Sequence, residues 1–113
     1  AMALHGADLV VVPQAGAVDE WPEGLYEGEL RVAALQNGYA VALCNRVGRE
    51  DCVEFAGESF VCDAGGVMLA RAPRGVDHIL FADIDLAAAE ASPARRLFLN
   101  DRRPDVYAGW FSR

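Results

Sequence analysis

Three short stretches of the sequence hold the residue types best suited to binding a small polar molecule. The first is Gln14, Ala15 and Gly16, which follow an apolar run at 9–12 and Pro13. Such a run is typical of a strand, and loops at the carboxyl end of a strand often carry ligand-binding groups. The Gln14 amide and the backbone amides of this loop would then hold a polar substrate group, although an ordinary turn explains the same residues.

The other two stretches offer charged and aromatic groups. Glu20 and Trp21 would give a carboxylate and an aromatic wall to an amine-bearing ligand, whereas a helix-start carboxylate and a packing tryptophan are the simpler interpretation. Asn45 and Arg46 follow the apolar run 39–44 and would donate hydrogen bonds to a carboxylate or carbamoyl group. An arginine that braces Asp51 or a neighbouring loop explains Arg46 equally well.

No residue of the sequence is a convincing catalytic nucleophile. The thiols are Cys44, Cys52 and Cys62, and the chain contains no lysine and no nearby histidine that would activate them. We therefore expect all three to be core thiols and assign no catalytic residue. An odd number of cysteines without a secretory signal favours free thiols in a reducing cytoplasm.

The bulk composition limits the partners. The net charge of −7, with 10 basic and 17 acidic residues, disfavours nucleic acid and anionic membranes, because phosphate contacts need a basic surface. No apolar run approaches the roughly 20 residues of a membrane helix. His5 and His78 fit no metal-site spacing, so we expect neither a metal nor a cofactor. The high apolar content, 53% of residues, instead favours a large protein–protein surface.

The pattern of apolar runs and breakers predicts an α/β domain over residues 1–113. We expect the last turn of a helix at 1–5, a main helix at about 22–37 that stops at Asn37 and Gly38, and a short helix at 86–91. Strands are expected at 9–12, 39–44, 59–62, 67–72 and 78–84, with a short strand or extended connection at 52–55 and turns at 47–51 and 63–66. Residues 95–113 are expected to form an extended tail. The result is a mixed sheet of about five strands with one main helix.

One helix cannot cover such a sheet. Five strands at a spacing of about 4.8 Å are some 20 Å wide, whereas a helix is about 10 Å wide. The runs 9–12, 39–44 and 79–82 are apolar on both faces, so 9–12 in particular is expected to be an interior strand. A second layer, from another chain or another segment, is therefore expected to cover the sheet.

Five short motifs occur in order along nearly all of the chain: GADLVVVP at 6–13, AALQNG at 33–38, NRVG at 45–48, FAGESF at 55–60 and DRRPDVY at 101–107. In this order they resemble the second half of the nitrilase superfamily of carbon–nitrogen hydrolases, in particular its N-carbamoylputrescine amidase and β-ureidopropionase-like members. The resemblance implies half of an αββα sandwich, whose subunits pair into αββααββα. It also implies a Cys, Glu and Lys catalytic set that precedes this chain, with the loop at Gln14 lining the pocket beside that Cys.

Three functions follow as expectations. The first is the C-terminal part of an enzyme that cleaves a small amide or N-carbamoyl group, inactive by itself, with either the N-terminal half or another copy as partner. The second is a non-catalytic module of the same ancestry that self-associates through its sheet. The third is a small ligand-binding domain that uses the loop at Gln14.

Overall fold

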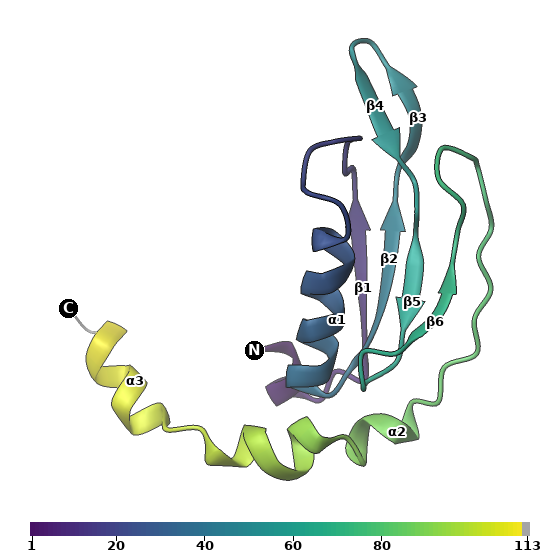
Figure 1. The fold of residues 1–113 in the computed structure, drawn as a ribbon. Coiled ribbons are helices and arrows are strands. Elements are labelled where there is room, and N and C mark those ends of the chain that lie inside the picture. The colour runs from purple at the N-terminus through teal and green to yellow at the C-terminus, as the bar shows by residue number, and fades with distance from the viewer. Residues whose placement is uncertain (112–113) are drawn as a thin grey trace.

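A mixed four-stranded sheet forms the body of the protein (Figure 1). The computed structural model describes residues 1–111. Strands β1 (Leu9–Gln14) and β2 (Ala40–Asn45) run parallel, and β5 (Phe60–Cys62) and β6 (Met68–Arg71) continue the sheet antiparallel in the order β1-β2-β5-β6. The predicted α/β class and mixed sheet are therefore confirmed, with four strands in the main sheet and two more in a separate hairpin.

That hairpin projects past the carboxyl ends of β1 and β2 (Figure 1). It consists of β3 (Val47–Glu50) and β4 (Val53–Ala56), paired antiparallel from Val47↔Ala56 to Glu50↔Val53. The predicted turn at 47–51 was wrong for most of its length, because β3 is a polar strand whose residues are mostly exposed and so lacks the apolar alternation by which strands are recognised.

Helix α1 (Leu25–Asn37) covers one face of the main sheet. It begins three residues later than predicted because Gly24 has a φ of 76° and cannot continue a right-handed helix, and it ends as predicted at Gly38, whose φ is 67°. Arg31 ties the helix to the β5–β6 turn by donating from Nε to the carbonyl of Gly66 at 2.8 Å. The buried core between helix and sheet consists of Ala34, Tyr39, Val41, Leu43, Phe60 and Cys62.

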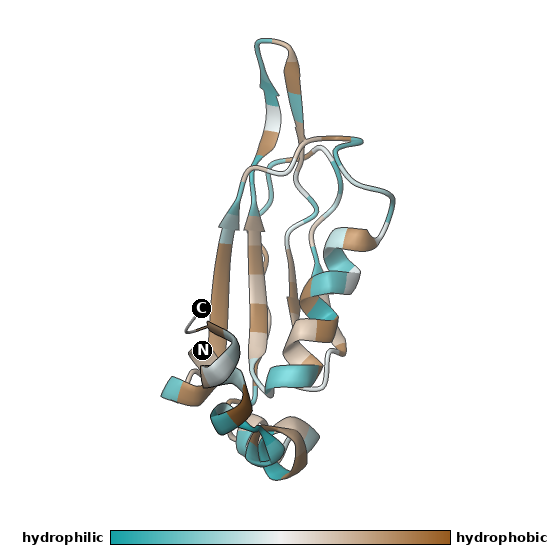
Figure 2. Cartoon of the chain, turned by 90° about the vertical axis from the view of Figure 1, so that its left-hand side faces the viewer, coloured by the Kyte–Doolittle hydropathy of each residue, from teal (hydrophilic) through white to brown (hydrophobic). Residues whose placement is uncertain are grey.

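The opposite face of the main sheet is open. Figure 2, which views the sheet from its β1 side, shows α1 on one side of the hydrophobic strands only. Leu9 and Cys44 are exposed on this face and Val11 is 56% exposed. The prediction of an interior strand at 9–12 was wrong for the described residues, since β1 is an edge strand there. For the same reason β1 continues through Pro13, because an edge strand tolerates a proline that a central strand does not.

The C-terminal third leaves the sheet. The strand predicted at 78–84 was wrong: no described strand pairs with this segment, in which Ile79 is 78% and Phe81 85% exposed. A short helix, α2 (Ala87–Glu90), follows where one was predicted. The tail predicted as extended from Arg95 is instead helical over a π-helical segment (Ala94–Phe98), a 3-10 turn (Leu99–Asp101) and α3 (Pro104–Phe111). Its last two residues, 112–113, lie outside the described part.

Residues 94–111 form an arm that runs away from the sheet (Figure 1).

The chain starts with a 3-10 helix (Met2–His5) that stops at Gly6, as predicted for a helix end. Among residues 1–111, no helix is both long and apolar enough to cross a membrane.

Candidate active-site pocket

A cavity of about 350 Å³ lies at the carboxyl ends of β1 and β2, beside the beginning of α1. Four of the seven residues predicted from the sequence line it: Gln14, Gly16, Trp21 and Asn45. Ala15, Glu20 and Arg46 do not belong to the lining. The position fits the general tendency of ligands to bind where the strands of an α/β sheet end.

Asn45 uses its side chain to hold two backbone segments of this cavity. Its Oδ1 accepts a hydrogen bond from the Gly16 amide at 2.7 Å, and its Nδ2 donates to the carbonyls of Gly57 at 2.8 Å and Gly16 at 3.3 Å. Both amide hydrogens are therefore engaged within the protein. The sequence suggested that Asn45 donates hydrogen bonds to a substrate. In the structure its side-chain amide donates to the backbone of the protein instead.

Glu20 and Arg46 have local partners outside the cavity. Glu20 Oε2 accepts from the backbone amide of Ala17 at 2.9 Å. Arg46 Nη1 lies 2.6 Å from Glu50 Oε2, and its guanidinium stacks over the ring of Phe55 at 4.5 Å from the centroid. Arg46 thus stabilises the β3–β4 hairpin. This agrees with the structural role that the sequence allowed for it, but its partner is Glu50 rather than Asp51.

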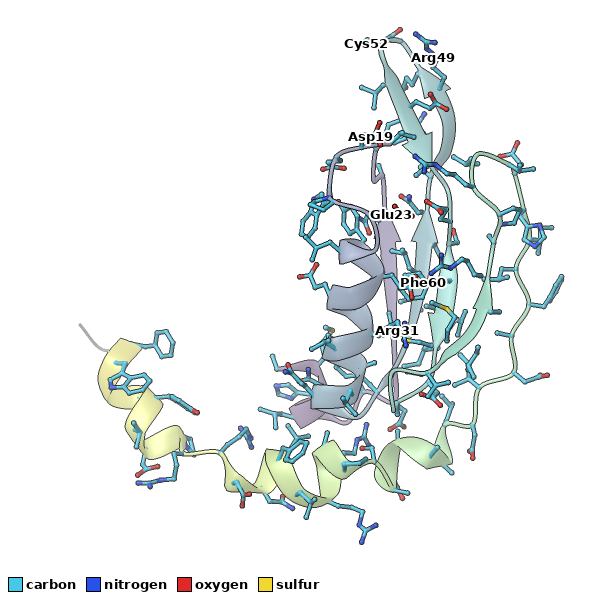
Figure 3. The ribbon with its side chains drawn as sticks, viewed as in Figure 1. Asp19, Glu23, Arg31, Arg49, Cys52 and Phe60 are labelled. Carbon is cyan, nitrogen blue, oxygen red and sulfur yellow. The ribbon has the colours of Figure 1, made fainter. Side chains whose placement is uncertain are left out.

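Trp21 forms an aromatic side of the cavity by stacking on Tyr26, with ring centroids 4.4 Å apart. Three carboxylates that were not predicted as site residues lie nearby in the lining: Asp19, Glu23 and Glu58. Figure 3 shows Asp19 and Glu23 on the segment between β1 and α1. The acidic residues at 19–23 are visible in the sequence, but only the structure shows that Asp19 and Glu23 line the cavity whereas Glu20 does not.

The pocket is acidic despite two arginines in its lining. Arg71 is ion-paired with Glu27, whose carboxylate also accepts a hydrogen bond from Arg31 at 2.9 Å. Arg74 Nη2 lies 4.0 Å from Asp19 Oδ1. Within residues 1–111, Glu23 and Glu58 form no ion pair. These two carboxylates are therefore the lining charges available to a positively charged ligand.

The cysteines are distributed differently from the prediction. Cys62 is buried in the core, and burial raises the pKa of its thiol. Cys44 and Cys52 are exposed, so the expectation of core thiols was wrong for both: Cys44 faces the open side of β2 and Cys52 lies at the tip of the hairpin (Figure 3). None of the three lines the cavity. The described residues contain no group of three or more His, Cys, Asp or Glu side chains arranged to hold a metal ion.

Comparison with known proteins identifies the family. The sequence profile of the family described as "Carbon-nitrogen hydrolase" matches residues 1–94. The chain belongs to the carbon–nitrogen hydrolase family.

Solved hydrolases of this family share the fold. The carbon–nitrogen hydrolase from Helicobacter pylori superposes with a TM-score of 0.81 at 33% identity, over 98% of this chain and 43% of that one. An amidase from Nesterenkonia superposes with a TM-score of 0.72 at 31% identity, over 96% of this chain and 37% of that one. The latter carries the acetamide moiety of fluoroacetamide as a covalent adduct on its active-site cysteine.

A curated hydrolase relative agrees. The N-carbamoylputrescine amidase of Arabidopsis thaliana is 27% identical over 95% of this chain and 40% of its own length. The chain thus spans less than half the length of the carbon–nitrogen hydrolases that it matches.

Proposed function

We propose that this chain is the C-terminal part of a hydrolase that cleaves a small amide or N-carbamoyl compound. The observation that carries the proposal is the open apolar face of the main sheet, on which Leu9, Val11 and Cys44 are exposed. A sheet with one bare apolar face forfeits about 25 cal/mol for each Å² left wet, so a covering layer is strongly favoured. The relatives contain more than half of their length outside the matched region, which is enough for that layer.

The nucleophile is expected to come from that other part. A thiolate would attack the substrate carbonyl carbon, the carbon–nitrogen bond would break with release of ammonia or an amine, and water would hydrolyse the thioester. None of the cysteines here lines the pocket, and the chain has no lysine. The cysteine adduct of the Nesterenkonia amidase supports the same chemistry in the complete protein.

This chain would contribute one side of the substrate pocket. Gln14 and the backbone at Gly16 present polar groups, and Trp21 with Tyr26 presents an aromatic surface. Glu23 and Glu58 favour a substrate with a positively charged end, for which the amine of an N-carbamoyl diamine is an example. Free, exposed thiols at Cys44 and Cys52 fit a reducing cytoplasm.

Complementation tests the proposal. The chain is assayed for ammonia release from short amides and N-carbamoyl amines, alone and after coexpression with the N-terminal portion of the Helicobacter pylori hydrolase, which lies outside the matched region. We expect no release from either part alone and release from the pair. A matched pair in which the active-site cysteine of the added portion is replaced by alanine should be inactive. Ammonia release by the chain alone, above background, would refute the proposal.

A second candidate is a non-catalytic module that self-associates, and the arm of residues 94–111 favours it. Trp110 is 64% exposed, and Val106, Tyr107 and Phe111 are exposed on the same short helix. The arm also carries Arg96 and Arg102, which form no ion pair among residues 1–111, in a chain whose net charge is −7, so it complements the acidic body of another copy. Light scattering after size exclusion would detect such an assembly, and a monomer that binds no hydrophobic dye would exclude both candidates.

A further inference from the structure

The geometry points to Asn45 as a positioning residue: we propose that its side-chain amide sets the distance between two backbone walls of the pocket and so determines how a small amide fits. The relevance to substrate binding rests on the proposed function, whereas the positioning itself is a property of this chain. One wall is the loop that follows β1, at Gly16, and the other is the turn between β4 and β5, at Gly57.

The three hydrogen bonds of the Asn45 side chain reach both walls. Gly16 is held through both of its backbone polar groups, because Oδ1 accepts from its amide at 2.7 Å and Nδ2 donates to its carbonyl at 3.3 Å. Gly57 is held through its carbonyl, at 2.8 Å. A single planar amide therefore fixes the separation of two segments that are joined to different strands.

Asn45 itself is anchored by the sheet. It is the last residue of β2 and is paired with Gln14 in the parallel ladder. Its backbone amide donates to Ser59 Oγ at 3.0 Å, and its carbonyl accepts from the same hydroxyl at 3.4 Å. A side chain on so fixed a backbone can hold loops in place, since groups mounted on regular elements are positioned more accurately than groups on loops.

The two walls also continue into the hairpin. The carbonyl of Gly16 accepts from Ala56 at 3.1 Å, and the amide of Val18 donates to the carbonyl of Glu54 at 2.8 Å. The amide of Gly57 donates to the carbonyl of Arg46 at 2.9 Å. The loop after β1 is thereby hydrogen-bonded along β4. Asn45, at the end of β2, lies at the junction between this hydrogen-bonded loop and the main sheet. Loss of its hydrogen bonds should therefore loosen the cavity mouth rather than the core.

Only an amide satisfies this site. Aspartate accepts from the Gly16 amide equally well, but an ionised carboxylate faces the carbonyls of Gly16 and Gly57 without a hydrogen to donate. When the carboxyl is protonated, it regains one donor. Asn45→Asp should therefore lose the Gly57 contact at neutral pH and recover it in acid, whereas Asn45→Ala should lose every contact at all pH values.

Amide hydrogen exchange on the full chain tests the positioning directly. For Asn45→Ala we expect the Gly16 amide, which loses its acceptor, to exchange about tenfold faster or more, which corresponds to the loss of about one hydrogen bond. The Gly57 amide donates to the Arg46 carbonyl, so it reports indirectly, and we expect it to exchange faster because its wall is no longer held through the Gly57 carbonyl. For Asn45→Asp we expect Gly16 to stay protected, and Gly57 to lose protection at pH 8 and regain it near pH 4, after correction for intrinsic rates. Val41 in the core should not change in either variant.

Asn37→Ala is the matched control, because Asn37 Nδ2 donates to the carbonyl of Ala33 at 2.9 Å on α1, away from the pocket. Unchanged exchange at Gly16 and Gly57 in Asn45→Ala would overturn the inference, and so would the absence of acid rescue in Asn45→Asp. In the complemented enzyme, Asn45→Asp should raise KM with little change in kcat, and acid should reduce the effect. Inactivity of every complemented variant would contradict the proposed function but leave the exchange result standing.

Discussion

Arg95 and Asp8 form an ion pair that joins the start of the C-terminal arm to the start of β1. Arg95 Nη2 lies 2.8 Å from Asp8 Oδ1 and also donates to the carbonyl of Ala7 at 2.6 Å. The arginine side chain is only 18% exposed. It packs close to Gly38, so the end of α1, the entry to β1 and the root of the arm meet at one point.

Replacing Arg95 by methionine should release the arm. The substitution leaves the carbonyl of Ala7 and the partly exposed carboxylate of Asp8 without this partner, at a cost of about 1–2 kcal/mol after solvent screening. Urea unfolding should show a lower midpoint, and limited proteolysis should cut earlier near residues 91–100. Arg96→Met is the control, since Arg96 is exposed and forms no ion pair within residues 1–111. Equal effects of the two substitutions would contradict this role.

Gly38→Ala should destabilise the protein more than Gly24→Ala. Both glycines have positive φ, so both substitutions cost about 1–2 kcal/mol in backbone strain. A Cβ on Gly38 would in addition lie 2.2 Å from Ser92 Oγ, whereas one on Gly24 meets nothing within 4 Å. We expect a further loss of about 1–3 kcal/mol at Gly38 in thermal or urea unfolding. A similar loss at both positions would mean that the contact with Ser92 is easily displaced.

Two of the three thiols should react with a thiol reagent in the folded isolated chain. Cys44 and Cys52 are exposed, and Cys62 should react only after denaturation. Cys44→Ser and Cys52→Ser variants assign the two reactive groups. Under the proposed function, Cys44 should become protected when the open face of the sheet is covered, while Cys52 stays reactive. Continued reaction of Cys44 in the active complemented enzyme would place the covering layer elsewhere.

Alkaline pH should destabilise the fold. Burial raises the pKa of both Cys62 and Tyr39, so the folded state retains these protons at pH values where the unfolded chain releases them. Their stabilisation is complete below the unfolded values, about 8.5 for a thiol and about 10 for a tyrosine, and is lost as pH rises through the folded values. Urea midpoints should fall between pH 8 and 11, and Cys62→Ala should lack the first part of that fall. A flat profile would contradict the prediction.

Much of the fold could be predicted because local chemistry decides it. Asn37 and Gly38 mark the end of α1, and the paired glycines Gly65 and Gly66 mark the turn between β5 and β6. The misses have a common cause. The hairpin strand β3, the unpaired segment around Ile79 and the helical arm are mostly exposed, so their sequence pattern is not constrained by a buried face.

The site was predicted only in part. Gln14 and Gly16 were found because they follow a clear strand. Glu58 was not, because its place in the lining depends on a turn in which Gly57 and Glu58 have φ values of 69° and 55°. The role of Asn45 depends on contacts with Gly16 and Gly57, which are far from each other in sequence. No single stretch of residues contains that information.

Pro13 has a consequence for the behaviour of the isolated chain. It lies near the carboxyl end of β1, the edge of the main sheet, and has no amide hydrogen to offer an incoming strand. A foreign strand that adds to this edge can therefore find edge amides only along Leu9–Val12, which shortens the ladder that it can form. Proline at this edge works against fibrous aggregation of a chain whose sheet has one open apolar face, and a substitution such as Pro13→Val should make it precipitate more readily.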